Sequence, residues 1–226
     1  NFLSIAAKKV KENKYQGNLN SGTINKRLTT LNTFLSWLES KGHIVRNPNF
    51  NDGKINKIAP RGLVEFVYLE DEEIKFLWNM EFDETVIEQK NYKEVRDIFL
   101  FMIFTGMRYS DVCNVNELCN YESGSIIMKA HKTSQNFQVP LNKNAEILFH
   151  RIKNYTKHSN QVFNRQLYGF FDKNNLFKYP QKGVNLGNKI EHISSHTGRR
   201  TFITRCLLNN VPLNEIMKYV GHRQLK

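Results

Sequence analysis

The apolar segment at residues 98–104 is the feature that most constrains how this chain folds. Its letters, IFLFMIF, contain no polar side chain, so a helix here has no face suited to water. The segment is also far too short to span a bilayer. Gly106 follows it closely, and glycine commonly ends a helix. The pattern therefore predicts a central helix that is covered on every side by other elements.

The rest of the chain predicts mostly helices. Apolar residues recur at helical spacing in residues 23–40, where Gly42 is placed to end the helix, and acidic residues precede an apolar stretch in 68–78. Residues 124–131 and 137–141 are β-like and flank the letters KTSQN, which predicts a hairpin. Further helices are expected at 145–156, 160–173, 195–209 and 213–220. The expected fold class is mainly α with a small antiparallel β-sheet (α+β).

The charge balance favours a polyanionic partner. The 226 residues carry 33 basic and 21 acidic side chains, for a formal net charge of +12. The three cysteines, Cys113, Cys119 and Cys206, form no CxxC pair, which suits a reducing compartment and argues against a disulfide framework or a zinc site. No secretory signal precedes the first helix. We expect no membrane association and no metal or other cofactor.

The chain divides into two parts at a stretch rich in glycine, proline and basic residues. Residues 1–50 predict a small helical domain, 51–66 an interdomain linker, and 67–226 a larger mixed domain. The first part is the denser in positive charge. Short hydroxyls and cations there can donate to phosphate oxygens, although an ordinary solvated face explains them about as well. The candidate phosphate-binding residues are Lys26, Thr30 and Thr33 in the helical domain and Lys54, Lys57 and Arg61 in the linker.

Arg108 follows the buried helix within the letters FTGMRYSDV. A guanidinium tethered to a rigid element is held in fixed geometry, as bidentate phosphate binding requires. A surface arginine paired with Asp111 is the alternative. Lys132 falls near the tip of the expected hairpin, where it could deliver a proton or a charge, although an ordinary turn lysine fits as well.

The letters SSHTGRRTF are more specific. Ser194 or Ser195 is suited to cap a helix, and His196 and Arg199 are then three residues apart on one helical face. Anions are favoured at a helix N-terminus, so this pair suits phosphoryl transfer. A capped helix with an inert histidine is the alternative. His222 follows Gly221 after the last expected helix, and by itself this pair indicates only a turn.

Taken together and in this order, these residues resemble the catalytic signature of the tyrosine recombinase (integrase) family. The family has an arginine in a TGxRxS turn, a lysine in a β-hairpin, an HxxR box at a helix start and a later Gly-His. The chain matches each part. The resemblance also covers the layout, which is a helical core-binding domain, a linker and a catalytic domain, and so spans essentially the whole chain.

The resemblance implies strand cleavage and rejoining in double-stranded DNA without a metal. Arg108 and Arg199 would hold the scissile phosphate and stabilise its transition state. His196 would assist proton transfer, Lys132 would protonate the leaving 5′ oxygen, and His222 would donate a hydrogen bond to the phosphate. A tyrosine would attack and form a 3′-phosphotyrosyl link. Asp111 is expected to support Arg108.

The sequence departs from the family at the nucleophile. The family's tyrosine lies about nine residues after the Gly-His histidine, and the 226-residue sequence ends at Lys226. Tyr219 and Tyr109 are poorly placed to replace it, because one precedes His222 on a helix and the other adjoins Arg108. We therefore expect the nucleophile to lie outside these 226 residues, and we expect no cleavage by this chain as it stands.

The family resemblance also implies an oligomeric state and a biological role, and three alternative functions stay open. It implies a homotetramer on DNA for the full-length protein, allows a monomer for this form, and favours a bacterial, nucleoid-associated protein of the cytoplasm that integrates or excises a mobile element. An N-terminal arm-binding domain is compatible with the non-Met start. The alternatives are a non-catalytic DNA-binding relative, a type IB topoisomerase and, least favoured, a basic helical protein that binds RNA.

Overall fold

The computed structural model describes residues 21–45, 66–115, 119–122, 124–129, 136–183 and 186–221. The chain divides into two compact units, Asn1–Val64 and Glu65–Lys226. The expected linker at 51–66 lies almost wholly outside the described residues, so the domain boundaries given above stay a prediction.

The described part of the first unit is one long helix, α2 (Ser21–Ser40), where the sequence predicted a helix over 23–40. Gly42 ends it in the left-handed region, at φ +71°, and the His43 N–H donates to the Leu38 carbonyl at 3.0 Å. The hydroxyls of Thr30 and Thr33 donate to carbonyls one turn earlier in α2. Both threonines are exposed, so their oxygens still face solvent.

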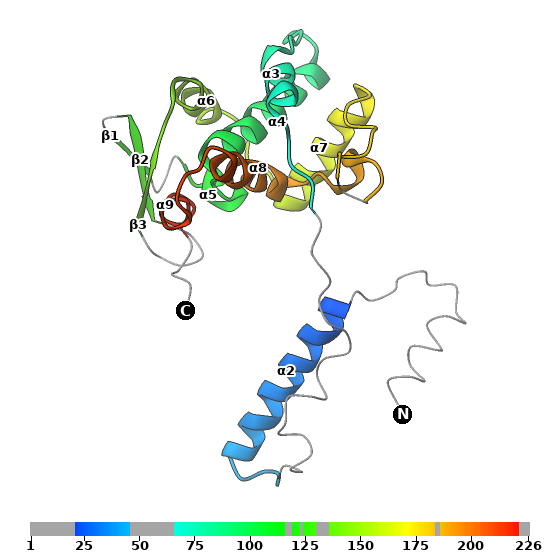
Figure 1. Ribbon diagram of the computed structural model, residues 1–226, viewed down its shortest axis with the longest axis vertical. Helices are drawn as coiled ribbons and strands as arrows, with labels where there is room; N and C mark the ends of the chain where they lie inside the picture. Colours follow the sequence, from blue (N-terminus) through cyan, green and yellow to red (C-terminus); the bar gives the residue numbers. More distant parts are fainter. Residues whose placement is uncertain are drawn as a thin grey trace, which may run out of the picture. The chain divides into compact units, whose positions relative to one another are not determined.

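The second unit is built around α4 (Ile87–Thr105), the long green helix in Figure 1. Its residues 98–103 are all buried, as the apolar run at 98–104 predicted, and Phe104 is partly buried. Three helices pack against it, α6 (Lys143–Ile152), α7 (Asn160–Lys173) and α8 (Ser195–Leu208). Two shorter helices also contact it, α3 (Asp71–Asn79) and α5 (Tyr109–Cys113). A helix without a polar face is stable only in such a position, because burial of its apolar side chains supplies the stabilisation.

Short helices and caps surround this centre. Glu70 caps the N-terminus of helix α3 (Asp71–Asn79). The Glu70 N–H donates to the Glu73 carboxylate at 2.6 Å in a capping box. Helix α7 (Asn160–Lys173) matches its predicted range at both ends, and α8 (Ser195–Leu208) and α9 (Leu213–Tyr219) each end one residue before the predicted end. Helix α6 (Lys143–Ile152) begins and ends earlier than the predicted range 145–156. The sequence did not predict α5 (Tyr109–Cys113) or the 3₁₀ helix η3 (Lys189–His192).

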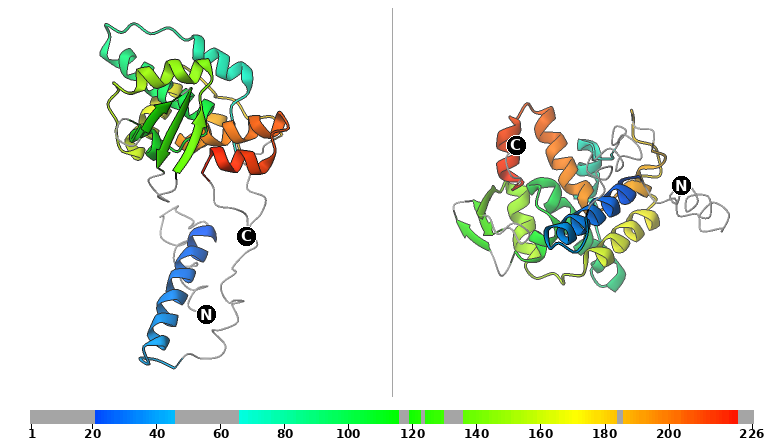
Figure 2. Two further views of the ribbon diagram at one scale, coloured as in Figure 1. Left: turned by 90° about the vertical axis from the view of Figure 1, so that its left-hand side faces the viewer. Right: turned by 90° about the horizontal axis from the view of Figure 1, so that it is seen from below.

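A three-stranded antiparallel sheet lies at one edge of the second unit (Figures 1 and 2). The predicted hairpin is present as β2 (Ser125–Lys129) and β3 (Asn136–Pro140), with Ile127 opposite Gln138. The sequence did not predict β1 (Cys119–Glu122), which pairs with β2. Helix α9 packs beside β3. The fold is mainly α with one small sheet, so the predicted fold class is confirmed.

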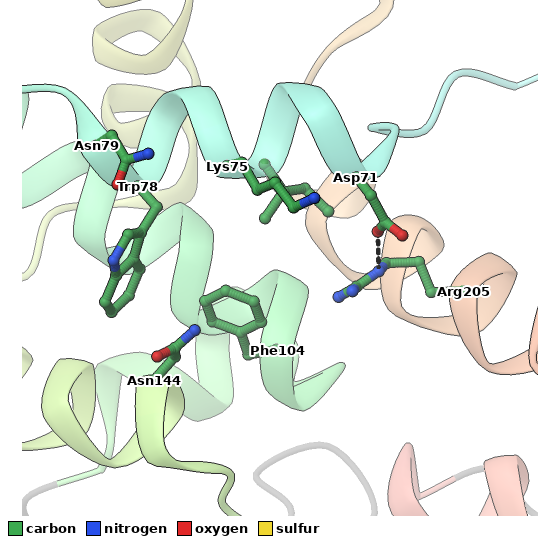
Figure 3. Close-up of a pocket in the computed structure, with 8 residues that line it drawn as sticks. Asp71, Lys75, Trp78, Asn79, Phe104, Asn144 and Arg205 are labelled. Atoms are coloured by element: carbon green, nitrogen blue, oxygen red, sulfur yellow. Dashed lines mark ion pairs between the residues drawn. The ribbon is translucent and has the colours of Figure 1, made fainter.

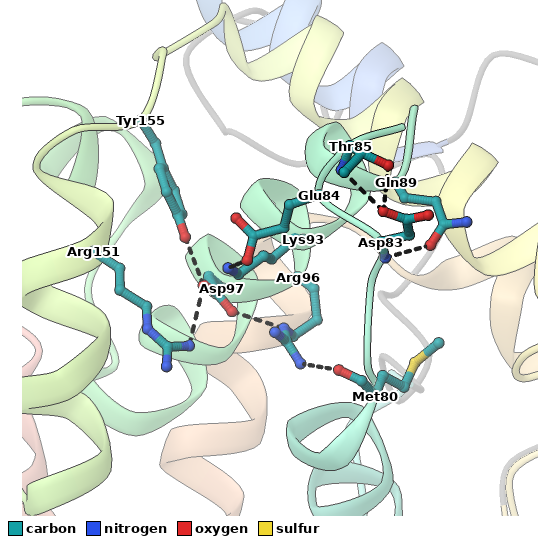
Figure 4. Close-up of polar contacts among 10 residues, drawn as sticks. All are labelled: Met80, Asp83, Glu84, Thr85, Gln89, Lys93, Arg96, Asp97, Arg151 and Tyr155. Atoms are coloured by element: carbon teal, nitrogen blue, oxygen red, sulfur yellow. Dashed lines mark hydrogen bonds and ion pairs between the residues drawn. The ribbon is translucent and has the colours of Figure 1, made fainter. Parts of the chain in front are cut away.

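A buried polar cluster joins α4 to the end of α3 and to Tyr155, which follows α6 (Figure 4). Asp97 is fully buried and accepts a 2.8 Å hydrogen bond from the Tyr155 hydroxyl. Its second oxygen lies 2.7 Å from the Arg96 Nε, although the two groups are not aligned as a hydrogen bond. Arg96 also donates to the carbonyls of Leu77, Trp78 and Met80, which satisfies the C-terminal end of α3.

Among the residues described, no helix is both long enough and apolar enough to cross a membrane.

Candidate active site

The turn that presents Arg108 is fixed by a close contact between two helices. Gly106 ends α4 at φ +67°, and its N–H donates to the Met102 carbonyl at 2.9 Å. A Cβ on this residue would lie 2.5 Å from the Phe202 ring of α8. Only glycine suits both the backbone conformation and the space. The chain can therefore turn against α8 and bring Arg108 to the start of α5.

Arg108 caps α5 and is partly buried, with 21% of its side chain exposed. Its Nη1 lies 3.7 Å from the Oδ2 of Asp111, which is itself buried. This geometry agrees with the expectation that Asp111 supports the arginine. The distance is longer than a hydrogen bond, so the guanidinium keeps donor capacity for an anion.

Helix α8 begins at the HxxR box. Ser194 caps it, and the Ser194 N–H donates to the Thr197 hydroxyl at 3.0 Å. His196 lies in the first turn and is exposed, whereas Arg199 is only 7% exposed. The predicted box at a helix start is therefore present, with the histidine at the surface and the arginine beneath it.

The Arg199 guanidinium joins two of the other motifs through the backbone. Its Nη1 donates to the Gly106 carbonyl at 2.9 Å, and its Nη2 donates to the Val220 carbonyl at 2.6 Å. Gly106 precedes the Arg108 turn, and Val220 is two residues ahead of His222. Arg199 thus joins the end of α4 and the end of α9 to the N-terminal half of α8.

Close packing of α8 on α4 makes this arrangement possible. Gly198 lies between His196 and Arg199, and a Cβ there would be 3.0 Å from the Met102 Cβ and 3.4 Å from the Phe99 carbonyl. Small residues let helix backbones approach, and the remaining contact surface then packs at interior density. The absence of a side chain at 198 therefore lets α8 lie close to α4 next to Arg199.

The electrostatics of the site are strongly positive. Burial, followed by the charge of Arg108, lowers the pKa of Arg199 to about 10, which still leaves it charged at neutral pH. The pKa of His196 is also lowered, first by loss of hydration and then by the positive charges of Arg200, Arg199 and Arg108. A neutral imidazole beside two guanidiniums can accept a proton while the arginines bind an anion.

Several predicted residues lie outside the described part of the chain. Lys132 falls between β2 and β3, and His222 follows Gly221, which has φ +59° after α9. Their places in the site stay predictions, as do those of Lys54, Lys57 and Arg61. Lys26 lies on α2 and is exposed, like Thr30 and Thr33.

The sequence reasoning missed two contributions to this site. Arg200 directly follows Arg199, is exposed, and adds positive charge beside His196. Its position directly after the HxxR box is the sequence signal that identifies it. Asn160 and Asn164 of α7 both bind Ser195, and no local sequence pattern links them to a residue more than thirty positions away.

A surface cavity of about 250 Å³ lies beneath α3 and is separate from this site (Figure 3). Trp78, Phe104 and Asn144 line it, and Arg205 closes one end through a 2.8 Å ion pair with Asp71. Arg205 is nine residues after His196 on α8, and so it lies on the opposite face of that helix. The cavity therefore does not open onto the arginine pair.

The comparison with protein families decides which kind of protein has this arrangement. The sequence profile of the phage integrase family matches residues 68–226, which includes every described residue of the candidate site. The chain belongs to the phage integrase family. It is therefore a tyrosine-type site-specific DNA recombinase, as the ordered motifs predicted. No curated protein sequence matches this integrase significantly.

Solved structures show the same fold. The integrase is similar to a Tn1549 transposon integrase solved with transposon right-end DNA, at 18% identity and a TM-score of 0.69, covering 97% of this chain and 76% of the other. It is similar to the XerH recombinase bound to its difH substrate, at 17% identity and a TM-score of 0.58, covering 93% and 61%. A lambda integrase dimer bound to a core site gives 13% identity and a TM-score of 0.59, covering 90% and 57%.

Proposed function

We propose that this integrase binds double-stranded DNA and cleaves and rejoins its strands through a 3′-phosphotyrosyl intermediate, using Arg108, Lys132, His196, Arg199 and His222. The observation that carries the proposal is the bridge made by Arg199. One buried guanidinium binds the backbone carbonyls at the end of α4 and at the end of α9, and it lies beside Arg108 and His196. Such a preorganised positive site suits a phosphate whose negative charge grows in the transition state.

Each side chain has a role that its chemistry allows. Arg108 and Arg199 hold the non-bridging oxygens of the scissile phosphate, and Asp111 keeps Arg108 in place. Neutral His196 takes the proton of the attacking tyrosine hydroxyl as the new phosphorus–oxygen bond forms. Lys132 gives a proton to the departing 5′ oxygen, and His222 donates a hydrogen bond to the phosphate. The family's tyrosine position follows His222 by about nine residues and is not among the 226 residues.

Binding of the duplex is proposed to extend to the first unit and the linker. Lys26, Thr30 and Thr33 are exposed on α2, and Lys54, Lys57 and Arg61 add positive charge along the chain. Phosphate contacts of this kind orient a protein on DNA without reading its sequence. The net charge of +12 supports such contacts.

The biological setting is proposed from the same family. Structures with this fold include a transposon integrase with circular intermediate DNA and a lambda integrase on a core site. We infer that this integrase serves the integration or excision of a mobile element in bacterial cytoplasm, at the nucleoid. We also infer that the full-length protein acts as a homotetramer on two DNA sites.

Duplex binding is tested by its salt dependence. The 226-residue chain is titrated against fluorescent duplex DNA as salt rises from about 50 mM to about 200 mM, and the affinity is expected to fall by about 10³-fold or more. An affinity that is unchanged over this range contradicts the DNA proposal. Lys26→Ala is expected to reduce the slope of log K against log [salt] by about one contact.

Catalysis is tested in a form of the protein that carries the family's tyrosine. It is incubated with a nicked duplex made from the ends of its own element, and the covalent protein–DNA adduct is measured. Arg108→Ala is expected to abolish the adduct and leave DNA binding nearly unchanged, because one phosphate contact is a small part of the interface. Arg205→Ala, on the opposite face of α8, is the matched control and is expected to keep full activity. Tight binding without any adduct would favour a non-catalytic relative.

A further inference from the structure

The first turn of α8 is held by a second helix as well as by its own cap. Ser195 is the first residue of α8 and is only 2% exposed. Its N–H donates to the Asn164 Oδ1 at 2.7 Å, and its hydroxyl donates to the Asn160 Oδ1 at 2.8 Å. Both asparagines lie in the first half of α7, four residues apart and so on one face.

Ordinary helix capping does not account for these contacts. The cap of α8 is already made by Ser194 and Thr197 within the same segment. The first N–H groups of a helix have no partner inside it, and Ser195 is too buried for water to serve instead. Asn164 therefore satisfies a backbone donor that would otherwise be buried alone, and it does so from a different helix.

The position of Ser195 gives these contacts a consequence for the reaction. Ser195 immediately precedes His196, and Arg199 lies one turn further along α8. Close packing at Gly198 fixes the body of α8 against α4, but it does not fix the first residue of the helix. The two asparagines bind that residue. If the first turn moved, the His196 imidazole would move away from Arg108 and Arg199. The buried Arg199 itself would stay in place.

We propose that Asn164, assisted by Asn160, is a positioning residue that holds the first turn of α8 and so places His196 against the two arginines. The inference rests on the proposed function, because it assigns His196 a part in strand cleavage. Neither asparagine touches the phosphate. Their effect passes through the backbone of Ser195. Substitution of either asparagine should therefore lower the rate of the chemical step and leave the affinity for DNA almost unchanged.

Asn164→Leu keeps the volume of the side chain and removes the oxygen acceptor, whereas Asn164→Asp keeps an acceptor. In a form that carries the family's tyrosine, Asn164→Leu is expected to slow single-turnover cleavage at saturating DNA by about 10- to 100-fold, since small misplacements of reacting groups have effects of this size. Asn164→Asp should recover most of the rate. Asn174→Ala is the matched control, because it also loses one side chain–backbone bond, at the other end of α7.

A second measurement separates positioning from folding and from the proposed function. The ring of His196 is titrated by NMR in the 226-residue chain, where no cleavage is needed. Asn164→Leu is expected to raise its pKa toward that of a free imidazole, because the ring moves away from Arg108, Arg199 and Arg200. Asn174→Ala should leave it unchanged.

The outcomes are distinct. An unchanged titration together with wild-type cleavage by Asn164→Leu overturns the inference. If that variant does not fold, Asn160→Ala, which loses only a side chain–side chain bond, is measured in the same two assays and must show the same direction of change. A shifted titration in a protein that never cleaves DNA would support the positioning role and count against the proposed function.

Discussion

The guanidinium of Arg199 donates a 2.6 Å hydrogen bond to the carbonyl oxygen of Val220, the residue that ends α9. The same side chain donates to Gly106 at the end of α4. One buried cation thus ties together three segments that are far apart in the sequence. The candidate active site depends on this connection, because each segment leads into a residue of the family signature.

Arg199→Ala is expected to destabilise the second unit by about 3 kcal/mol, since two buried carbonyls lose a charged donor. Arg199→Lys should give a smaller loss, because an ammonium keeps the charge but lacks the planar fork. Urea unfolding followed by circular dichroism measures both. Equal midpoints for the wild type and Arg199→Ala would show that the bridge does not stabilise the fold.

Gly106→Ala is expected to cost about 2–4 kcal/mol, because it combines a left-handed backbone with the 2.5 Å approach to the Phe202 ring. The two causes can be separated. In a Phe202→Ala background the steric part disappears, and the Gly106→Ala penalty should fall to about 1–2 kcal/mol. A double-mutant cycle in thermal or urea unfolding gives the coupling. Penalties of equal size in both backgrounds would exclude the steric contribution.

The stability of the second unit should depend on pH through His196. Loss of hydration and the neighbouring arginines hold its pKa below the ordinary value of about 6.5 that it has in the unfolded chain. Between those two pKa values the unfolded chain binds more protons, so stability falls as pH decreases through this window. His196→Gln removes the group.

As the pH is lowered from about 7.5 to about 5, the unfolding free energy of the wild type should therefore decrease more than that of His196→Gln. Urea unfolding at a series of pH values measures it. Parallel curves for the two proteins would mean that the folded environment leaves the histidine unshifted.

Asp97→Ala is expected to cost about 3–5 kcal/mol, because it leaves the buried Arg96 without its ion-pair partner. Tyr155→Phe removes only the 2.8 Å hydrogen bond and should cost about 1 kcal/mol. Asp172→Ala is the control, since its 2.7 Å pair with Lys178 is at the surface and should be worth about 1 kcal/mol or less. Calorimetric melting distinguishes the three. A loss for Asp97→Ala no larger than for Asp172→Ala would contradict a structural role for the cluster.

Local sequence signals predicted the helices well where each signal was complete. The apolar run at 98–104 required a covered helix, and the predicted range 160–173 is that of α7. The short strand β1 was missed, because its four residues show no clear alternation and its existence depends on pairing with β2. The order of the motifs was enough to indicate the family, because the order and spacing of the motif residues can be read directly from the sequence.

The sequence by itself determined the family, the fold class and the identity of the candidate catalytic side chains, because composition, periodicity and ordered motifs are local properties of the chain. Only the tertiary structure decided which backbone carbonyls Arg199 binds, why residue 106 must be glycine, and that Asn164 reaches Ser195. These are contacts between residues that are tens of positions apart. They exist only when α4, α7, α8 and α9 pack together, because hydrogen bonds and steric fit depend on distances that no local pattern specifies.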